Sequence, residues 1–218
     1  EKPKTAWQMK LEFANLEHRS RDVLVMEDLA VGYPGNAALL EGIKLTVRGR
    51  EHIVLTGPNG SGKTTLLRTI AGRLCPLGGR FHLGPSIHLG YMSQEQELLD
   101  PDWSAFETIQ HTAPFNDTEA RSFLHHFLFS GDDPLRPARD LSYGERARLS
   151  LAVLVAQGCN FLLLDEPISH LDIPSRTRFE QALASFEGTT LTVVHDRYFI
   201  ERFATQLWKV EGQTIRMS

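Results

Sequence analysis

A glycine-rich segment followed by a lysine and two threonines is the part of the sequence best suited to bind phosphate. It reads Gly57, Pro58, Asn59, Gly60, Ser61, Gly62, Lys63, Thr64 and Thr65. This order matches the P-loop pattern G-x-x-x-x-G-K-S/T, in which glycines let backbone N–H groups turn toward phosphate oxygens. We expect Lys63 to reach the β- and γ-phosphates of a nucleotide, Thr64 to bind Mg²⁺, and Thr65 to add a phosphate contact. The alternative is a glycine-rich turn that only caps a helix.

An acidic pair follows a wholly apolar run later in the chain. Asp165 and Glu166 come directly after the residues FLLL at 161–164. An apolar run without alternation indicates a strand buried on both faces of a parallel sheet, and such sheets bind ligands at the carboxyl ends of their strands. We expect Asp165 to hold Mg²⁺ through water, and Glu166 to orient the attacking water or accept its proton. Alternatively, the two acids only end a strand at the surface.

The segment LSYGE, at residues 141–145, lies between these two patterns. Ser142 and Glu145 form the sequence of a capping box, so we expect a helix to begin there with backbone N–H groups exposed near Gly144. Together, the three patterns make the chain resemble the ATP-binding-cassette (ABC) ATPases over nearly its whole length. The resemblance implies that Ser142, Gly144 and Glu145 contact the γ-phosphate of an ATP held by an opposite ABC domain. Tyr143 and Glu145 depart from the family's LSGGQ.

The resemblance also assigns roles to four residues outside these patterns. Gln94, in GYMSQ, is similar to a glutamine that meets Mg²⁺ and the attacking water, and His195, in VVHDRYF, to a histidine that contacts the γ-phosphate. Tyr33 is similar to an aromatic residue that stacks on adenine, and Asp172, in HLD, to a residue at the seam between two domains. Taken singly, Gln94, His195 and Tyr33 also fit ordinary structural or solvated positions. The cofactors that the family implies are ATP and Mg²⁺.

Two segments narrow the resemblance to the ABC-F group, soluble proteins with two ATPase domains that act on ribosomes. DEPISHLD, at 165–172, is similar to that group's DEPTNHLD, and HDRYF, at 195–199, to its HDRxF. The resemblance implies an ATP-hydrolysing, C-terminal domain that works on the ribosome with a second ABC domain, in the same chain or in a second copy. The first alternative is the ATPase subunit of a membrane transporter, with a transporter membrane domain as its partner. A DNA-maintenance ATPase is less favoured, because no coiled coil or zinc insertion interrupts the chain.

The elements that must position these residues alternate between strands and helices, which indicates an α/β core. We expect strands at 52–56, 161–165 and 189–195, and helices at 63–72, 142–157 and 174–186. The predicted fold is a P-loop NTPase of the ABC type, with a mixed or parallel sheet core, an antiparallel β subdomain and a short inserted helical subdomain. Residues 1–8 are interpreted as a linker remnant or tail, and residues 9–218 as one ABC domain whose helical subdomain spans about 103–157.

Composition argues against several other classes of protein. The 218 residues include 23 Lys and Arg against 27 Asp and Glu, and the formal charge of −4 argues against coating nucleic acid by bulk charge. No apolar run approaches the roughly 20 residues of a membrane helix, so no direct membrane insertion is expected. The two cysteines indicate reduced thiols and a cytoplasmic protein. Arg146 and Arg148 are interpreted as solvated helix charges, and His125 and His126 lack metal-ligand spacing.

Overall fold

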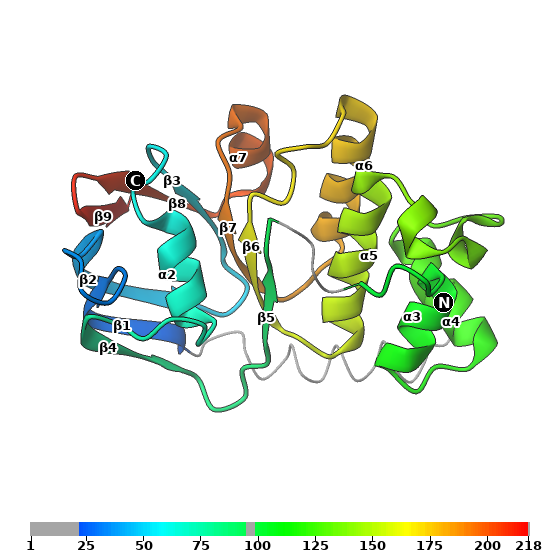
Figure 1. The fold of residues 1–218 in the computed structure, drawn as a ribbon, viewed down its shortest axis with the longest axis horizontal. Coiled ribbons are helices and arrows are strands. Elements are labelled where there is room, and N and C mark those ends of the chain that lie inside the picture. The colour runs from blue at the N-terminus through cyan, green and yellow to red at the C-terminus, as the bar shows by residue number, and fades with distance from the viewer. Residues whose placement is uncertain (1–21, 95–98, 218) are drawn as a thin grey trace. The chain divides into compact units, whose positions relative to one another are not determined.

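The structure is a computed structural model that describes residues 22–94 and 99–217 (Figure 1). The predicted linker remnant or tail at 1–8 and the first residues of the predicted ABC domain, 9–21, lie outside the described residues. The described chain divides into two compact units, which we treat separately. The sheet unit contains residues 22–91, 160–165 and 187–217, and the helical unit contains the described residues between 92 and 159 together with 166–186.

A six-stranded sheet forms the centre of the sheet unit. Its strands stand in the order β5-β6-β7-β3-β8-β9. They are β3 (His52–Thr56), β5 (Leu89–Met92), β6 (Phe161–Asp165), β7 (Thr189–Val193), β8 (Gln206–Glu211) and β9 (Thr214–Met217). β7 pairs in parallel with both β6 and β3, β3 pairs in parallel with β8, and β9 returns antiparallel to β8. Every residue of β6 and β7 is buried, which explains why neither strand alternates apolar and polar residues.

A second, antiparallel sheet and one helix complete the core of this unit. The sheet has the order β2-β1-β4 and consists of β1 (Asp22–Val31), β2 (Leu40–Arg48) and β4 (Gly78–Leu83). Helix α2 (Lys63–Ile70) buries Leu66, Leu67 and Ile70 in a hydrophobic core that includes residues of both sheets. Helix α7 (Arg197–Phe203) follows β7. The predicted ABC-type fold, with a mixed sheet and an antiparallel β subdomain, is confirmed.

The helical unit is built from four α-helices and two short 3₁₀ helices. The α-helices are α3 (Ala105–Thr112), α4 (Asp117–His126), α5 (Tyr143–Ala156) and α6 (Ile173–Ala184). The 3₁₀ helices are η1 (Asp133–Leu135) and η2 (Ala138–Asp140). Capping boxes begin α3 at Ser104 and α5 at Ser142, as the sequence predicts. The segment predicted to be helical, about 103–157, lies in this unit, which also contains α6.

Arg148 of α5 corrects one prediction from the sequence. Its side chain is a buried group rather than a solvated charge, with 3% of its surface exposed. One guanidinium nitrogen, Nη1, donates to the backbone oxygens of Phe127 at 3.0 Å and Leu128 at 2.7 Å. Burial lowers the pKa of Arg148. Leu128 has a φ of 61°, in the left-handed region, so the arginine holds a strained turn that follows α4. The pattern of charges along the helix sequence gives no sign that Arg148 is buried.

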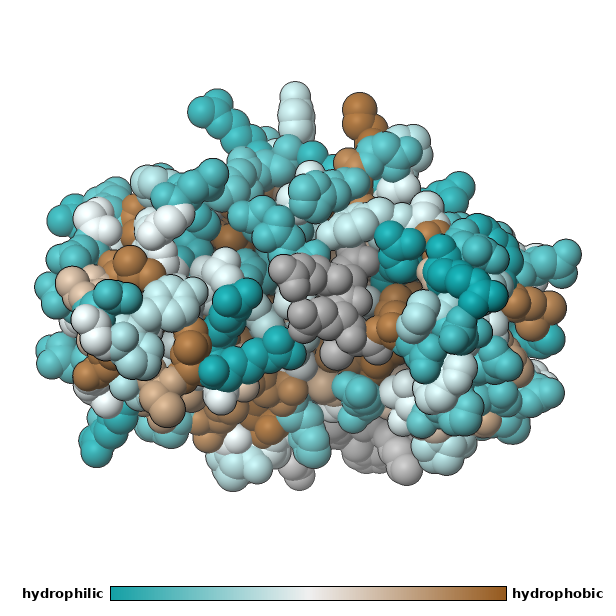
Figure 2. Space-filling view, viewed as in Figure 1, coloured by the Kyte–Doolittle hydropathy of each residue, from teal (hydrophilic) through white to brown (hydrophobic). Residues whose placement is uncertain are grey.

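Hydrophilic residues predominate on the face of the molecule drawn in Figure 2, with hydrophobic residues scattered among them. Large hydrophobic side chains that reach the surface of the helical unit include Trp103, Leu135 and Ile173. Among residues 22–94 and 99–217, no helix combines the length and the apolar character needed to span a lipid bilayer.

Candidate nucleotide-binding site

The predicted phosphate-binding segment connects β3 to α2 in the sheet unit. β3 ends at Thr56 and α2 begins at Lys63, so residues 57–62 form the loop between a buried strand and a helix N-terminus. The ammonium group of Lys63 donates to the backbone oxygens of Gly57 at 2.9 Å and Pro58 at 2.8 Å. The lysine is therefore folded over the loop, and only 5% of its surface is exposed. The loop brings an ammonium group and the amide donors of a helix N-terminus to one place.

Two glycines of this loop are required by close packing. A Cβ atom added to Gly57 would lie 2.7 Å from the Cβ atom of Val210. Gly62 has a φ of 95°, and an added Cβ atom would lie 2.9 Å from the Cβ atom of Leu39. Both contacts are shorter than carbon atoms tolerate, so the backbone can follow this path only with glycine at these positions.

The loop also contains unused hydrogen-bonding capacity. Within the described part of the chain, the hydroxyl of Ser61 is buried and has no hydrogen-bond partner. The helix that follows has no side-chain hydrogen bond at its N-cap, Gly62. Buried donors without acceptors are unfavourable by about 1–3 kcal/mol each, and phosphate oxygens are acceptors. The residues of the loop therefore fit the phosphate groups of a nucleotide.

Asp165 lies at the carboxyl end of β6, and each of its carboxylate oxygens accepts a hydrogen bond from a hydroxyl group. Thr64 donates to Oδ1 at 3.0 Å, and Tyr91 donates to Oδ2 at 3.3 Å. Asp165 itself is 3% exposed. Burial, and next the negative charge of Asp165, raise the pKa of Tyr91, so its hydroxyl keeps the proton that it donates. Sequence analysis identified Thr64 and Asp165 but missed Tyr91.

The oxygen atoms of Thr64 and Asp165 fit Mg²⁺, which usually binds through one or two side chains together with substrate phosphates. Larger metal-binding groups are absent from the part of the chain that the structure describes: no three or more His, Cys, Asp or Glu side chains are placed to hold a metal ion.

The parallel strands bring further predicted residues to the same sheet edge. β7 stands between β3 and β6, so the loop after β3, His195 after β7 and Asp165 at the end of β6 all lie at the carboxyl edge. His195 is exposed, and the next residue, Asp196, caps α7 by accepting a bond from the Phe199 amide at 2.9 Å. Tyr33, in the loop after β1, is 42% exposed, which leaves its ring available for stacking.

Gln94, in the helical unit, contacts the start of the segment LSYGE. The hydroxyl of Tyr143 donates to the backbone oxygen of Gln94 at 2.8 Å. The side-chain nitrogens of Gln94 and His170 lie 3.4 Å apart, and the Tyr143 ring stands edge-on to the His170 ring at 5.5 Å. The tyrosine that replaces a family glycine therefore joins three motifs that are far apart in the sequence. No pattern in the sequence indicated this contact.

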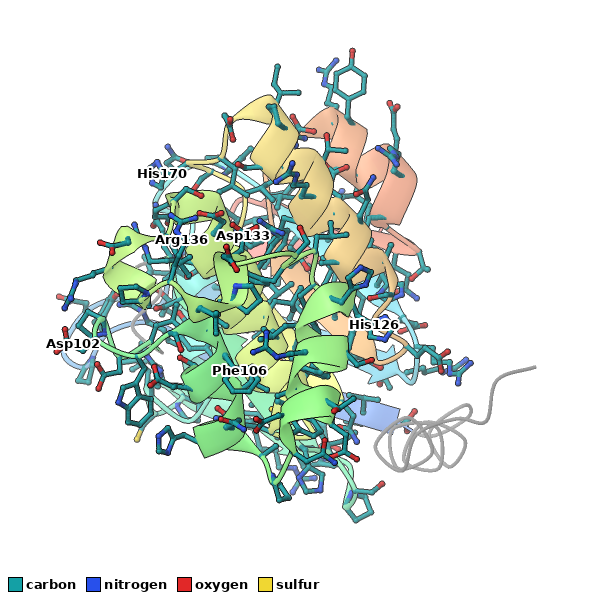
Figure 3. The ribbon with its side chains drawn as sticks, turned by 90° about the vertical axis from the view of Figure 1, so that its right-hand side faces the viewer. Asp102, Phe106, His126, Asp133, Arg136 and His170 are labelled. Atoms are coloured by element: carbon teal, nitrogen blue, oxygen red, sulfur yellow. The ribbon has the colours of Figure 1, made fainter. Side chains whose placement is uncertain are left out.

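The predicted capping box holds the negative charge of Glu145 at the start of α5. Ser142 donates its backbone N–H to the carboxylate of Glu145 at 2.7 Å, and its hydroxyl accepts from the Glu145 amide at 3.2 Å. Burial opposes the charge of Glu145, but these hydrogen bonds and nearby arginines bring its pKa below the ordinary value. Arg136 lies 3.4 Å from Glu145 and 3.6 Å from Asp133, its neighbour in Figure 3.

Gly144 allows α5 and α6 to approach closely. A Cβ atom on Gly144 would lie 2.5 Å from the Cβ atom of Ser175, in the first turn of α6. The glycine expected at a nucleotide contact is therefore also needed for packing between two helices. The sequence did not indicate this second role, because Ser175 lies outside every motif identified there.

Glu166 has an unusual backbone conformation. Its φ is 49°, in the left-handed region that non-glycine residues seldom adopt. Backbone strain of this kind costs on the order of 1–3 kcal/mol and is found preferentially at functional sites. The conformation supports a functional interpretation of the second acidic residue over that of an ordinary strand end.

The predicted site residues thus fall into two groups. The sheet unit holds Tyr33, residues 57–65, Asp165 and His195, and the helical unit holds Gln94, residues 142–145, Glu166 and Asp172. A buried strand, a glycine-rich loop and a helix beginning with lysine, beside an aspartate on a nearby parallel strand, define a P-loop nucleotide-binding protein.

Comparison with known families identifies the class more narrowly. The profile of the ABC transporter family, ABC_tran, matches residues 40–169, more than half of the chain. The chain therefore belongs to the ABC family of ATPases, as the sequence resemblance indicated.

Curated relatives agree with this family. The chain is 42% identical to YdiF of Bacillus subtilis over 195 residues, which cover 89% of the chain and 30% of YdiF. It is 34% identical to the energy-dependent translational throttle protein EttA of Mycobacterium tuberculosis, covering 87% of the chain and 35% of EttA. It is also 34% identical to the ATP-binding protein Uup of Escherichia coli, covering 93% and 33%. These relatives are ABC-F proteins, so the predicted group is confirmed. The chain spans about a third of their length.

Solved structures confirm the fold. A metal-chelate type ABC transporter in an inward-facing conformation matches with a TM-score of 0.75 at 20% identity, covering 91% of this chain and 83% of that chain. The ATP-binding cassette MJ0796, a dimer bound to ADP and Pi, matches with a TM-score of 0.73 at 19% identity, covering 89% and 97%. At these identities the likeness establishes the architecture alone.

Proposed function

We propose that this chain is a Mg²⁺-dependent ATP-binding and ATP-hydrolysing domain of an ABC-F protein, and that it drives a switch on the ribosome. The observation that carries the proposal is the arrangement around the P-loop. Lys63 is folded over the loop, and Thr64 is hydrogen-bonded to Asp165 at 3.0 Å. This combination of one ammonium group, one hydroxyl and one carboxylate supports a site for a nucleoside triphosphate and its metal ion.

In the proposed reaction, the chain's own residues bind the triphosphate and position water. The backbone N–H groups of the loop and of the helix start donate to the phosphate oxygens, and Lys63 exchanges its contacts with Gly57 and Pro58 for the β- and γ-phosphates. Thr64, Asp165 and Gln94 would hold Mg²⁺, which would supply positive charge beside the phosphate oxygens. Tyr33 stacks on adenine.

Three residues act around the γ-phosphate. Glu166 orients the attacking water or takes its proton, Gln94 meets the same water, and His195 contacts the γ-phosphate. Positioning and charge stabilisation supply most of the rate enhancement in phosphoryl transfer, so the placement of these groups matters more than their acidity.

We further propose that the active form pairs two ABC domains, in one chain or in two copies. Ser142, Gly144 and Glu145 then contact the γ-phosphate of the nucleotide held by the other domain, and Asp172 lies at the seam. Two observations support this: the LSYGE segment forms a capped helix start, and the solved structure of MJ0796, which has the same fold, is described as a dimer. The chain taken alone is accordingly expected to hydrolyse ATP slowly.

The proposed partner is the ribosome and the proposed location is the cytoplasm, with this chain as the C-terminal domain of its protein. Two observations support this: DEPISHLD and HDRYF match the ABC-F pattern, and the relative EttA is named a translational throttle. The proposal covers two roles on the ribosome, that of a translation factor and that of an antibiotic-resistance protein. The transporter alternative rests only on a shared fold at 20% identity. The curated relatives cited above give it no support.

Nucleotide binding by this chain tests the first part of the proposal. Lys63→Ala removes the ammonium group and is expected to weaken ATP binding at least tenfold in a calorimetric titration with Mg²⁺, because a charged hydrogen bond to phosphate is lost. Unchanged affinity would show that the loop does not hold the phosphates.

Sedimentation through a sucrose cushion tests the partner. The native protein carrying Glu166→Gln is expected to pellet with purified ribosomes in the presence of ATP, since the bound nucleotide persists. The matched control, Glu166→Gln together with Lys63→Ala, should stay in the supernatant. Recovery of the Glu166→Gln protein with membrane vesicles and not with ribosomes would support the transporter alternative.

A further inference from the structure

Asp165 is held from two sides by hydroxyl groups of different kinds. The Thr64 hydroxyl, on Oδ1, belongs to a residue proposed to bind Mg²⁺ itself. The Tyr91 hydroxyl, on Oδ2 at 3.3 Å, belongs to a residue of the segment GYMSQ to which the sequence assigned no role. Because rotation of an aspartate carboxylate about its last bond is weakly restricted, a fixed donor on the second oxygen decides which way the first oxygen faces.

Tyr91 is well placed to be such a fixed donor. It lies on β5, the strand next to β6, and only 8% of its surface is exposed. Arg68, on α2, is close enough to Tyr91 that Tyr91 is the main cause of the raised pKa of the Arg68 guanidinium. The Arg73 guanidinium stands 4.6 Å from the centre of its ring. The hydroxyl therefore donates to Asp165, and the ring is held between the sheet and a cation.

We propose that Tyr91 is a positioning residue for the metal site, and that its hydroxyl orients the Asp165 carboxylate toward Mg²⁺ through the hydrogen bond to Oδ2. The inference rests on the proposed function, because it assigns Asp165 to the metal. Tyr91 touches neither nucleotide nor metal in this account. Outer hydrogen bonds of this kind usually change metal affinity by about 10- to 100-fold when they are removed.

The test measures how strongly the metal ion improves nucleotide binding by this chain. The affinity for AMP-PNP, which is not hydrolysed, is measured by calorimetry in MgCl₂ and again in EDTA, and the ratio of the two affinities is the metal dependence. Tyr91→Phe keeps the ring under Arg73 and removes only the hydroxyl. We expect it to lower the ratio by about tenfold and to leave the affinity in EDTA unchanged.

Three further variants complete the test. Arg68→Met removes the positive charge beside Tyr91 from a half-buried position on α2, and we expect a smaller loss, about two- to threefold. Its result stands even where Tyr91→Phe fails to fold, which circular dichroism would reveal. Tyr198→Phe is the matched control, because Tyr198 lies on α7 with 76% of its surface exposed, and it should change nothing. Asp165→Asn should abolish the metal dependence.

The outcomes separate this inference from the proposed function. An unchanged ratio in both Tyr91→Phe and Arg68→Met overturns the positioning role, as does an equal loss of affinity with and without metal, which marks a purely structural residue. If the wild-type chain binds no AMP-PNP, or if Asp165→Asn keeps the full metal dependence, the proposed function itself fails.

Discussion

Replacing Gly144 with alanine would test whether the LSYGE segment is constrained by packing as well as by nucleotide chemistry. The added methyl group would lie 2.5 Å from the Cβ atom and 2.8 Å from the Oγ atom of Ser175. Carbon atoms prefer separations of about 3.5–4.0 Å, so α5 and α6 must separate by on the order of 1 Å to accept it. Overpacking of this kind costs about 1–3 kcal/mol.

Two effects must be separated to measure that penalty. Alanine in place of glycine in a helix contributes up to about 1 kcal/mol of stability, which hides part of the clash. Ser175→Gly removes both atoms that clash and costs about 1 kcal/mol by itself for the same reason. It keeps the backbone N–H that donates to Asp172 at 3.2 Å, so the cap of α6 survives.

Urea unfolding of the wild type, the two single variants and the double variant gives the interaction between the two sites. We expect the double variant to be more stable than the sum of the single effects predicts, by about 1–3 kcal/mol, because the clash no longer exists. Additive effects, equal within about 0.5 kcal/mol, would refute the packing argument and leave nucleotide contact as the only role of Gly144.

Other predictions concern hydrolysis, pH and thiol chemistry. In the native protein, Glu166→Gln is expected to keep ATP binding and slow hydrolysis by about 100-fold or more, and a normal turnover rate would remove Glu166 from its role. Burial lowers the pKa of His52, so the folded chain takes up a proton less readily than the unfolded chain. Stability should therefore be full above a pH of about 6.5 and fall below it, and melting curves between pH 7.5 and 5.5 should show a weaker dependence in His52→Gln. Burial raises the pKa of Cys159 to about 11, whereas Cys75 is exposed, so Ellman's reagent should titrate one thiol in the folded chain and two in urea. Two reactive thiols in the folded chain would contradict the burial of Cys159.

Much of the fold and of the candidate site could be predicted because the relevant signals are local. The P-loop is a contiguous segment whose backbone path is set by its own glycines, and the capping boxes at Ser104 and Ser142 join residues three positions apart. Buried parallel strands such as β6 and β7 show unbroken apolar runs, since both of their faces are covered. Motifs of this kind depend on neighbours in sequence, so the sequence by itself determined the family, the nucleotide loop and the acidic pair.

Only the tertiary structure decided which distant residues meet. Tyr91 bonds to Asp165 because β5 and β6 are neighbours in the sheet, although the two residues are far apart in the chain. Gly144 packs against Ser175, and Arg148 is buried against the turn at Leu128. In each pair at least one partner lies outside every motif, so the sequence does not mark the contact. Contacts between distant segments depend on strand order and helix packing, which arise from the whole chain at once, so no local pattern could have indicated them.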